Sequence, residues 1–263
     1  MVKNRLVFLG TAGGRHMVFS QERKSGGLLL ELDGKRIAVD PGPGALVHMQ
    51  RLKLHPEKTD AVMLSHIHID HSSDVNILLD GIEKPVLVAE EHCVRKKSDY
   101  YEHPRVSKYH QDKSKVFAVS ADQSVDLDGL KIETAKTNHT CPCVGFVISG
   151  TKKIGYASDG IYFKGQEKYF EGCDLLILNV HIPKGFETAD KYMSVDDAIL
   201  FLRAMKRKPQ LTVVTHISSL MLRANLWRQI KIISESTGCN VIFAEDFMEL
   251  DLGNLSAAPR ILK

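Results

Sequence analysis

The sequence Ser65-His66-Ile67-His68-Ile69-Asp70-His71 follows directly after an apolar run, Ala61–Leu64, that predicts a strand. Residues two apart on an extended chain point the same way, so His66 and His68 are expected on one side. Asp70 and His71 come next, as the chain turns into a helix. Imidazole nitrogen and carboxylate oxygen are ligands that Zn²⁺ and similar ions bind. The stretch therefore predicts a metal site at a strand end, rather than a chance run of polar residues in a surface loop.

The composition is that of a globular chain. Of its 263 residues, 43% are apolar and 25% are charged, which excludes intrinsic disorder, a fibrous repeat and a coiled coil. No apolar run approaches the roughly 20 residues of a membrane helix, and Leu6–Leu9 is too short for a signal-peptide core. A net charge of +3 is too small to indicate nucleic-acid binding by bulk electrostatics. The five scattered cysteines suit reduced thiols, so we expect a cytoplasmic protein with no membrane partner.

Short apolar runs bounded by Gly, Asp, Lys or Ser recur along the chain and predict strands. They are 6–9, 28–32, 36–39, 61–64, 86–88, 116–119, 130–132, 144–148, 154–157, 175–180, 211–214 and 241–243. Helical periodicity predicts helices over 44–54, 73–82 and 198–205, and one more from Leu220 to near Gly238. Ser194 and Asp197 have the spacing of a capping box. Because no linker interrupts this pattern, we expect a single α/β domain over residues 1–263 with two mixed sheets.

The segment His92–Lys113 fits neither pattern and is interpreted as an insertion, either a long loop or a short helical segment. It holds six basic and three acidic residues, with Tyr100, Tyr101 and Tyr109 among them. Cations interleaved with aromatic rings suit a substrate grip that stacks bases beside phosphate contacts. The alternative is a solvated surface loop or a dimer contact.

Further motifs follow in chain order on both sides of the histidine stretch. They are Val39-Asp40-Pro41-Gly42, Asn138-His139-Thr140 ahead of Gly145-Phe146, Ala157-Ser158-Asp159-Gly160 and Val214-Thr215-His216. Together with His66-x-His68-x-Asp70-His71, this set resembles the metallo-β-lactamase superfamily of metal-dependent hydrolases. The resemblance covers nearly the whole chain.

The resemblance implies a four-layer αββα sandwich of two mixed β-sheets flanked by helices, with metals along one edge. It implies two divalent ions, zinc by preference and manganese or iron as alternatives. The implied ligands are His66, His68 and His139 for the first ion, Asp70, His71 and His216 for the second, and Asp159 as a bridge. Asp40 would orient a ligand, a common role for a nearby carboxylate. Other histidines match no motif position and are assigned no function, namely His55, His92, His103, His110 and His181.

Particular residues favour one branch of the superfamily. Members that cleave β-lactams typically carry Cys where this chain has Asp159, and oxygen-reducing di-iron members carry Glu where it has His68. The runs 8–11, 142–146 and 215–219 resemble the ribonuclease Z and cyclic phosphodiesterase branch. Two departures argue against transfer-RNA processing. No Gly/Pro-rich arm that grips RNA is found in the sequence, and Tyr192 stands where a helper histidine of ribonuclease Z would be.

The predicted activity is metal-dependent hydrolysis through a dinuclear centre and a bridging hydroxide. Asp70 is the predicted catalytic residue, because it would both bind metal and accept a proton from the attacking water. A phosphodiester is preferred, since two divalent cations complement its charge; the substrate is a nucleotide-type or small-molecule diester, or RNA. The same site suits a carboxylic ester, a lactone or a thioester. An alternative of another class is a non-catalytic member that binds nucleic acid. No substrate-binding residue is assigned, and a homodimer is left open.

Overall fold

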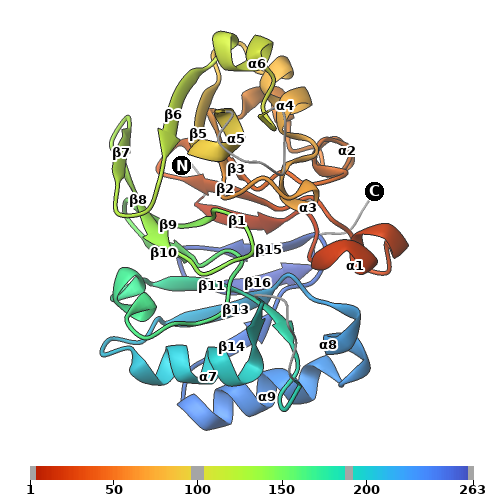
Figure 1. The fold of residues 1–263 in the computed structure, drawn as a ribbon, viewed down its shortest axis with the longest axis vertical. Coiled ribbons are helices and arrows are strands. Elements are labelled where there is room, and N and C mark those ends of the chain that lie inside the picture. Colours follow the sequence, from red (N-terminus) through yellow and green to blue (C-terminus); the bar gives the residue numbers. More distant parts are fainter. Residues whose placement is uncertain (1–3, 96–103, 187–191, 260–263) are drawn as a thin grey trace. The chain divides into compact units, whose positions relative to one another are not determined.

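The computed structural model describes residues 4–95, 104–186 and 192–259. They form two compact units, each built on one β-sheet (Figure 1). Unit 1 comprises residues 4–11, 24–95, 104–120 and 245–259, and unit 2 comprises residues 12–23, 121–186 and 192–244. The expectation that residues 1–263 act as a single domain stays a prediction.

Unit 1 is built on an eight-stranded mixed sheet in the order β16-β15-β1-β2-β3-β4-β5-β6. Its strands are β1 Arg5–Phe8, β2 Leu28–Leu32, β3 Lys35–Val39, β4 Ala61–Leu64, β5 Val86–Glu90, β6 Lys115–Val119, β15 Met248–Asp251 and β16 Ser256–Pro259. Its helices are α2 Ala45–Arg51, η1 Pro56–Lys58, α3 Ile69–Ser72, α4 Val75–Gly81, α5 Glu91–Val94 and α6 Lys108–Lys113. The strands from β3 to β6 run parallel. Their carboxyl ends therefore meet at one sheet edge, where Asp40 follows β3 and Ser65 follows β4.

Unit 2 is built on a second mixed sheet in the order β14-β13-β11-β10-β9-β8-β7, with β12 paired to β11. Its strands are β7 Ser124–Leu127, β8 Leu130–Lys136, β9 Val144–Ser149, β10 Lys153–Tyr156, β11 Leu175–Ile182, β12 Met193–Ser194, β13 Leu211–Thr215 and β14 Val241–Phe243. Its helices are α1 Gly14–Ser20, η2 Gln166–Phe170, α7 Val195–Ala204, α8 Ser219–Arg223 and α9 Leu226–Thr237. Strands β10, β11, β13 and β14 run parallel, so their carboxyl ends also share one edge.

The core of unit 2 lies between its sheet and the helices α7, α8 and α9. Helices α7 and α9 contact each other, and they pack on β11 and β14, respectively (Figure 1). Phe170 and Phe201 are fully buried there, with ring centroids 5.8 Å apart. Burying two aromatic side chains contributes several kcal/mol, on the order of 2 kcal/mol or more each. This packing fixes the strands whose ends carry the polar residues described below.

Every strand predicted from the sequence is present. Those at 28–32, 61–64 and 241–243 have the predicted ends, and the ends of the others are shifted. The structure adds β7, β12, β15 and β16, which the sequence analysis did not predict. Helices predicted over 44–54, 73–82 and 198–205 correspond to α2, α4 and α7. The α/β fold class with two mixed, helix-flanked sheets is confirmed.

One predicted helix is wrong in its extent. The apolar stripe from Leu220 towards Gly238 is divided between α8 and α9, because Asn225 adopts a left-handed conformation with φ of 62°. The Asn225 side chain accepts a hydrogen bond from the Arg228 backbone N–H and caps α9. Asparagine tolerates this backbone region and is a favoured N-cap, so a local preference overrides the longer periodicity.

The segment predicted as an insertion, His92–Lys113, has short helices at its described ends. Its first residues belong to α5 and its last residues form α6. Residues 96–103, which include Tyr100 and Tyr101, lie outside the described residues. Tyr109 is 66% exposed on α6. Among the described residues, no helix combines the length and apolar character needed to cross a membrane.

The capping box predicted at the start of α7 is confirmed. The Ser194 hydroxyl accepts the Asp197 backbone N–H at 3.0 Å, and the Asp197 carboxylate accepts the Ser194 backbone N–H at 2.9 Å. We expect Ser194→Ala to lower the free energy of unfolding by about 1 kcal/mol, because the Asp197 backbone N–H loses its acceptor at the helix end. Urea denaturation followed by circular dichroism measures this loss. Ser236→Ala within α9 is the control and should leave stability unchanged; an equal loss in both variants would contradict the prediction.

Candidate metal centre

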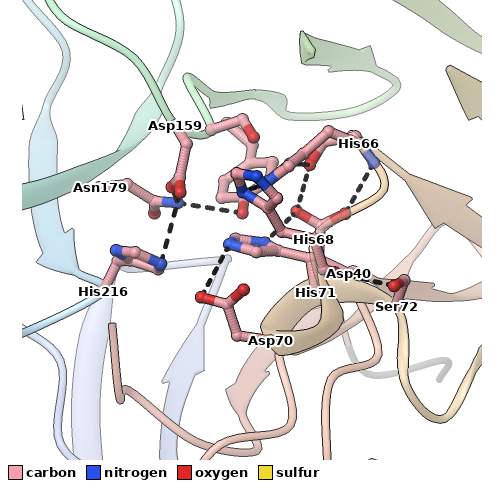
Figure 2. A network of polar contacts seen from close by, with 12 residues as sticks. Asp40, His66, His68, Asp70, His71, Ser72, Asp159, Asn179 and His216 are labelled. Atoms are coloured by element: carbon pink, nitrogen blue, oxygen red, sulfur yellow. Dashed lines mark hydrogen bonds and ion pairs between the residues drawn. The ribbon is translucent and has the colours of Figure 1, made fainter. Parts of the chain in front are cut away.

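The predicted histidine stretch forms a polar cluster at the carboxyl end of β4 in unit 1 (Figure 2). The loop after β4 carries His66 and His68, and α3 begins directly afterwards and carries Asp70 and His71. His66 is fully buried and His71 is 4% exposed. The expectation that this stretch runs from a strand end into a helix is confirmed.

The carboxylate of Asp40 organises this cluster. Its Oδ1 accepts the Ser65 backbone N–H at 2.7 Å, and its Oδ2 accepts the Ser65 hydroxyl at 2.6 Å. The same Oδ2 lies 2.9 Å from Nδ1 of His71. An Nδ1–H donated to this carboxylate leaves Nε2 of His71 as the nitrogen with a lone pair. Asp40 therefore holds the ring of His71 in one orientation. The role of His71 as a metal ligand stays a prediction.

Two pairs of donor atoms in unit 1 each have the separation of ligands that share an ion. Nε2 of His66 lies 3.1 Å from Nδ1 of His68, and Nε2 of His71 lies 3.7 Å from Oδ2 of Asp70. Donor atoms about 2.0–2.1 Å from one tetrahedral ion are roughly 3.3 Å apart. Asp40, His66 and His71 also each offer one donor atom within 4.8 Å of the others. The donor types and spacings of this cluster fit a divalent cation.

A second cluster lies at the edge of unit 2, around the carboxylate of Asp159 (Figure 2). Its Oδ2 is 3.8 Å from Nε2 of His139 and 3.5 Å from Nε2 of His216. Its Oδ1 accepts a hydrogen bond from the Asn179 side-chain amide at 2.7 Å. One oxygen thus faces two imidazoles while the other is fixed by an amide. Carboxylate oxygen and imidazole nitrogen are donor types that bind divalent metal ions together.

Three residues of these clusters have a left-handed backbone within two residues of a strand end. Asp40 follows β3 with φ of 48°, His216 follows β13 with φ of 58°, and Ser158, beside Asp159, has φ of 56°. Such conformations cost free energy in non-glycine residues and concentrate at functional sites. Here they turn the chain sharply at the sheet edge. The strain therefore places polar side chains where the strands end.

Glycines allow backbone to approach both clusters closely. A Cβ on Gly42 would lie 1.9 Å from the carbonyl oxygen of Asp70, and a Cβ on Gly13 would lie 2.1 Å from that of His216. Both distances are far below van der Waals contact. Only glycine fits at these two positions without moving a predicted ligand.

His181 and Tyr192 belong to the unit 2 cluster, although the sequence analysis assigned His181 no function. Their rings stack with centroids 4.3 Å apart and an interplanar angle of 24°. The His181 ring centroid lies 5.3 Å from that of His216, and the Tyr192 centroid lies 5.4 Å from that of His139. The sequence could have indicated this position of His181. Asn179 and His181 lie two residues apart on β11 and therefore share one side of the strand.

Cys143 packs against the backbone of the same cluster. Its Sγ lies 3.5 Å from the Ser158 hydroxyl and 3.6 Å from the Asp159 carbonyl oxygen. Burial raises the pKa of the Cys143 thiol well above its ordinary value. The thiol is therefore neutral, and it fills space beside the Asp159 backbone.

The two mixed, helix-flanked sheets with polar clusters at their strand ends define the metallo-β-lactamase fold. The metallo-beta-lactamase fold protein YhfI from Bacillus subtilis matches with a TM-score of 0.77 and 20% identity, over 94% of this chain and 98% of that chain. Human tRNase Z, short form, matches with a TM-score of 0.66 and 17% identity, over 94% and 98%. At these identities the likeness establishes the fold alone.

Sequence comparison then places the chain in a family. Residues 35–217 match the Beta-lactamase superfamily domain. An uncharacterized protein of Methanocaldococcus jannaschii is 32% identical over 258 residues, which is 95% of either chain. The chain therefore belongs to the β-lactamase superfamily, and the resemblance drawn from its motifs is confirmed.

More distant relatives carry functional names. A metal-dependent hydrolase of Thermoplasma acidophilum is 24% identical over 224 residues, covering 80% of this chain and 88% of that protein. Ribonuclease Z of Kineococcus radiotolerans is 27% identical over 158 residues, covering 56% and 48%.

The glycine contacts of unit 1 lead to a prediction. Gly42→Ala should lower the free energy of unfolding by about 1–3 kcal/mol, because the new methyl group must displace the start of α3. The imidazole NMR signals of His71 should shift with it. Denaturant titration and histidine-selective NMR measure the two effects. Gly81→Ala is the control, since a Cβ there meets nothing within 4 Å; a Gly42→Ala protein as stable as this control would contradict the contact.

Proposed function

We propose that this chain is a metal-dependent phosphodiesterase whose two histidine–carboxylate clusters hold two divalent cations. The observation that carries the proposal is donor spacing. Within each unit, imidazole nitrogens and carboxylate oxygens approach one another to between 3.1 and 3.8 Å. Ligands of a common ion have this spacing.

The proposed ligand assignment combines this spacing with the order of the motifs and membership of the superfamily. The first ion is held by His66, His68 and His139, the second by Asp70, His71 and His216, and Asp159 bridges them. Mixed imidazole and carboxylate donors suit zinc, with manganese or iron as alternatives. The similarity to a protein named a metal-dependent hydrolase supports this assignment.

The residues of the chain have distinct roles in the proposed reaction. Bound divalent cations supply Lewis acidity and lower the pKa of water. Asp70 is only 10% exposed, and its carboxylate accepts a proton from the attacking water. Asp40 holds the ring of His71 in one orientation, and Asn179 does the same for the carboxylate of Asp159. Buried partners of this kind fix ligand geometry before substrate binds.

A phosphodiester is proposed over a carboxylic ester because its negative charge complements two cations. Similarity to proteins named ribonuclease Z and tRNase Z supports a phosphorus centre. Precursor transfer RNA itself is not the proposed substrate. The helper histidine expected from ribonuclease Z is replaced by Tyr192, whose ring is stacked on His181.

The first prediction concerns metal content. After chelation and reloading, elemental analysis should find about two transition-metal ions per chain. His68→Ala should retain about one ion and lose several orders of magnitude in hydrolysis rate, because one site loses a ligand. His16→Ala, an exposed position on α1, is the control and should keep both ions. Absence of bound metal under every loading condition would contradict the proposal.

The second prediction concerns the substrate. Metal-loaded protein should hydrolyse bis(para-nitrophenyl) phosphate faster than para-nitrophenyl acetate and should process precursor transfer RNA poorly. An activated aryl leaving group departs without a proton, so replacement of the helper histidine has no effect on it. Initial rates from absorbance and gel analysis of the RNA measure the three activities.

Each contrary result of this comparison selects another function. Faster hydrolysis of the acetate would indicate a carboxylic-ester, lactone or thioester hydrolase. Efficient trimming of precursor transfer RNA would indicate a ribonuclease Z. Full metal content with no turnover of any substrate would favour a binding protein that retains the fold.

A further inference from the structure

The ring of Tyr192 lies among three imidazoles of unit 2. It stacks on His181 with centroids 4.3 Å apart, and its centroid lies 5.4 Å from that of His139 and 6.1 Å from that of His216. The interplanar angle with His216 is 29°, so these two rings are close to parallel. His139 precedes β9 and His216 follows β13. One aromatic ring therefore lies against two proposed metal ligands that come from separate loops.

The pairing of β12 with β11 directs Tyr192 towards these ligands. Met193 pairs with Val180, and both side chains are buried in the core of unit 2. Successive side chains on a strand point to opposite faces, so the residues next to this pair point away from that core. They are Tyr192, which precedes Met193, and His181, which follows Val180, and both are only half-buried. The fold thus places the two rings on the same side as the ligands.

The backbone at the start of α1 limits the movement of His181. A Cβ on Gly14 would lie 2.7 Å from Cε1 of the His181 ring, and Gly14 has a left-handed φ of 74°. Backbone this close leaves the imidazole no space on that side, because protein interiors are close-packed. Tyr192 therefore stacks on a ring that is itself held by the fold.

A ring packed against an imidazole restricts the imidazole's rotation. The last torsion of a histidine side chain is broad, so the ring does not fix its own plane. A metal ligand needs one orientation, because its lone pair must point at the ion. In unit 1 the Asp40 carboxylate orients His71 through a hydrogen bond. In unit 2 aromatic packing can do the same, since ring pairs contribute about 0.5–1.5 kcal/mol beyond the area that they bury.

We propose that Tyr192 is a positioning residue whose planar ring holds the imidazoles of His139 and His216 in the orientation that binds metal. The inference rests on the proposed function, since it concerns ligands of the same two ions. It assigns this role to the ring of Tyr192 and not to its hydroxyl.

The test measures the Zn²⁺ affinity of three variants by chelator competition. Tyr192→Ala should bind Zn²⁺ roughly 10- to 100-fold more weakly than wild type, the usual effect of removing a residue that supports metal ligands. Tyr192→Leu keeps apolar volume but has no planar face, and it should lose a similar factor. Tyr192→Phe keeps the ring and should stay within about threefold of wild type.

A matched control removes an aromatic ring elsewhere in unit 2. Phe19 on α1 is 93% exposed, and Phe19→Ala should bind Zn²⁺ as wild type does. Circular dichroism establishes that each variant is folded. If Tyr192→Ala does not fold, the comparison of Tyr192→Leu with Tyr192→Phe decides the question.

Three results would overturn the proposal. Wild-type affinity in both Tyr192→Ala and Tyr192→Leu would show that the side chain does not support the ligands. Wild-type affinity in Tyr192→Leu alone would show that it only fills space. A loss in Tyr192→Phe as large as that in Tyr192→Ala would assign the effect to the hydroxyl.

NMR of the metal-free protein gives a readout that does not depend on bound metal. The imidazole ¹⁵N signals of His139 and His216 should be broader in Tyr192→Ala and Tyr192→Leu than in wild type, because the rings exchange between orientations. Tyr192→Phe should match wild type, and equal line widths in all variants would contradict the positioning role. Wild-type protein that binds no Zn²⁺ would instead refute the proposed metal centre, while the line widths still decide whether Tyr192 fixes the two rings.

Discussion

The carboxylate of Asp40 is the constraint on which the rest of the unit 1 cluster depends. It is 2% exposed, and a buried charge is tolerated only when its oxygens are fully hydrogen-bonded. Ser65 and His71 supply those bonds. A single buried group thereby ties the end of β3 to the loop after β4 and to α3. The need to satisfy this charge fixes the orientation of His71, a proposed metal ligand, before any ion binds.

Unit 2 also contains a buried carboxylate whose oxygens contact polar side chains, but the residues differ. Asp159 is 1% exposed; one of its oxygens faces two imidazoles and the other accepts a bond from Asn179. In both units, parallel strands end at one sheet edge, and a left-handed residue turns the chain there. Glycine supplies the space for that turn beside Asp70 and His216. In each unit, the strand ends therefore determine where the donor side chains of the cluster lie.

The sequence predicted those features that depend on residues close together in the chain. Apolar runs identified the buried strands, and the motif order identified the ligand positions of a superfamily that comparison confirms. Strands β15 and β16 were missed because neither contains a continuous apolar run. The first pairs with β1, which lies far away in sequence, and the second pairs with β15. The stacking of His181 on Tyr192 was missed for a related reason. It brings together residues from separate elements, and no periodicity encodes such a contact.

The discontinuity of unit 1 has a consequence for synthesis on the ribosome. Strand β1 pairs with β2 on one side and with β15 on the other, and Arg5 contacts Glu249, which lies 244 positions later. All strands of unit 2 lie within residues 121–244, so its sheet can be completed first. Until β15 emerges, one edge of β1 has no partner strand, and unpaired edges are templates for aggregation. The sheet of unit 1 is therefore completed later than that of unit 2, although β1 precedes every strand of unit 2 in the sequence.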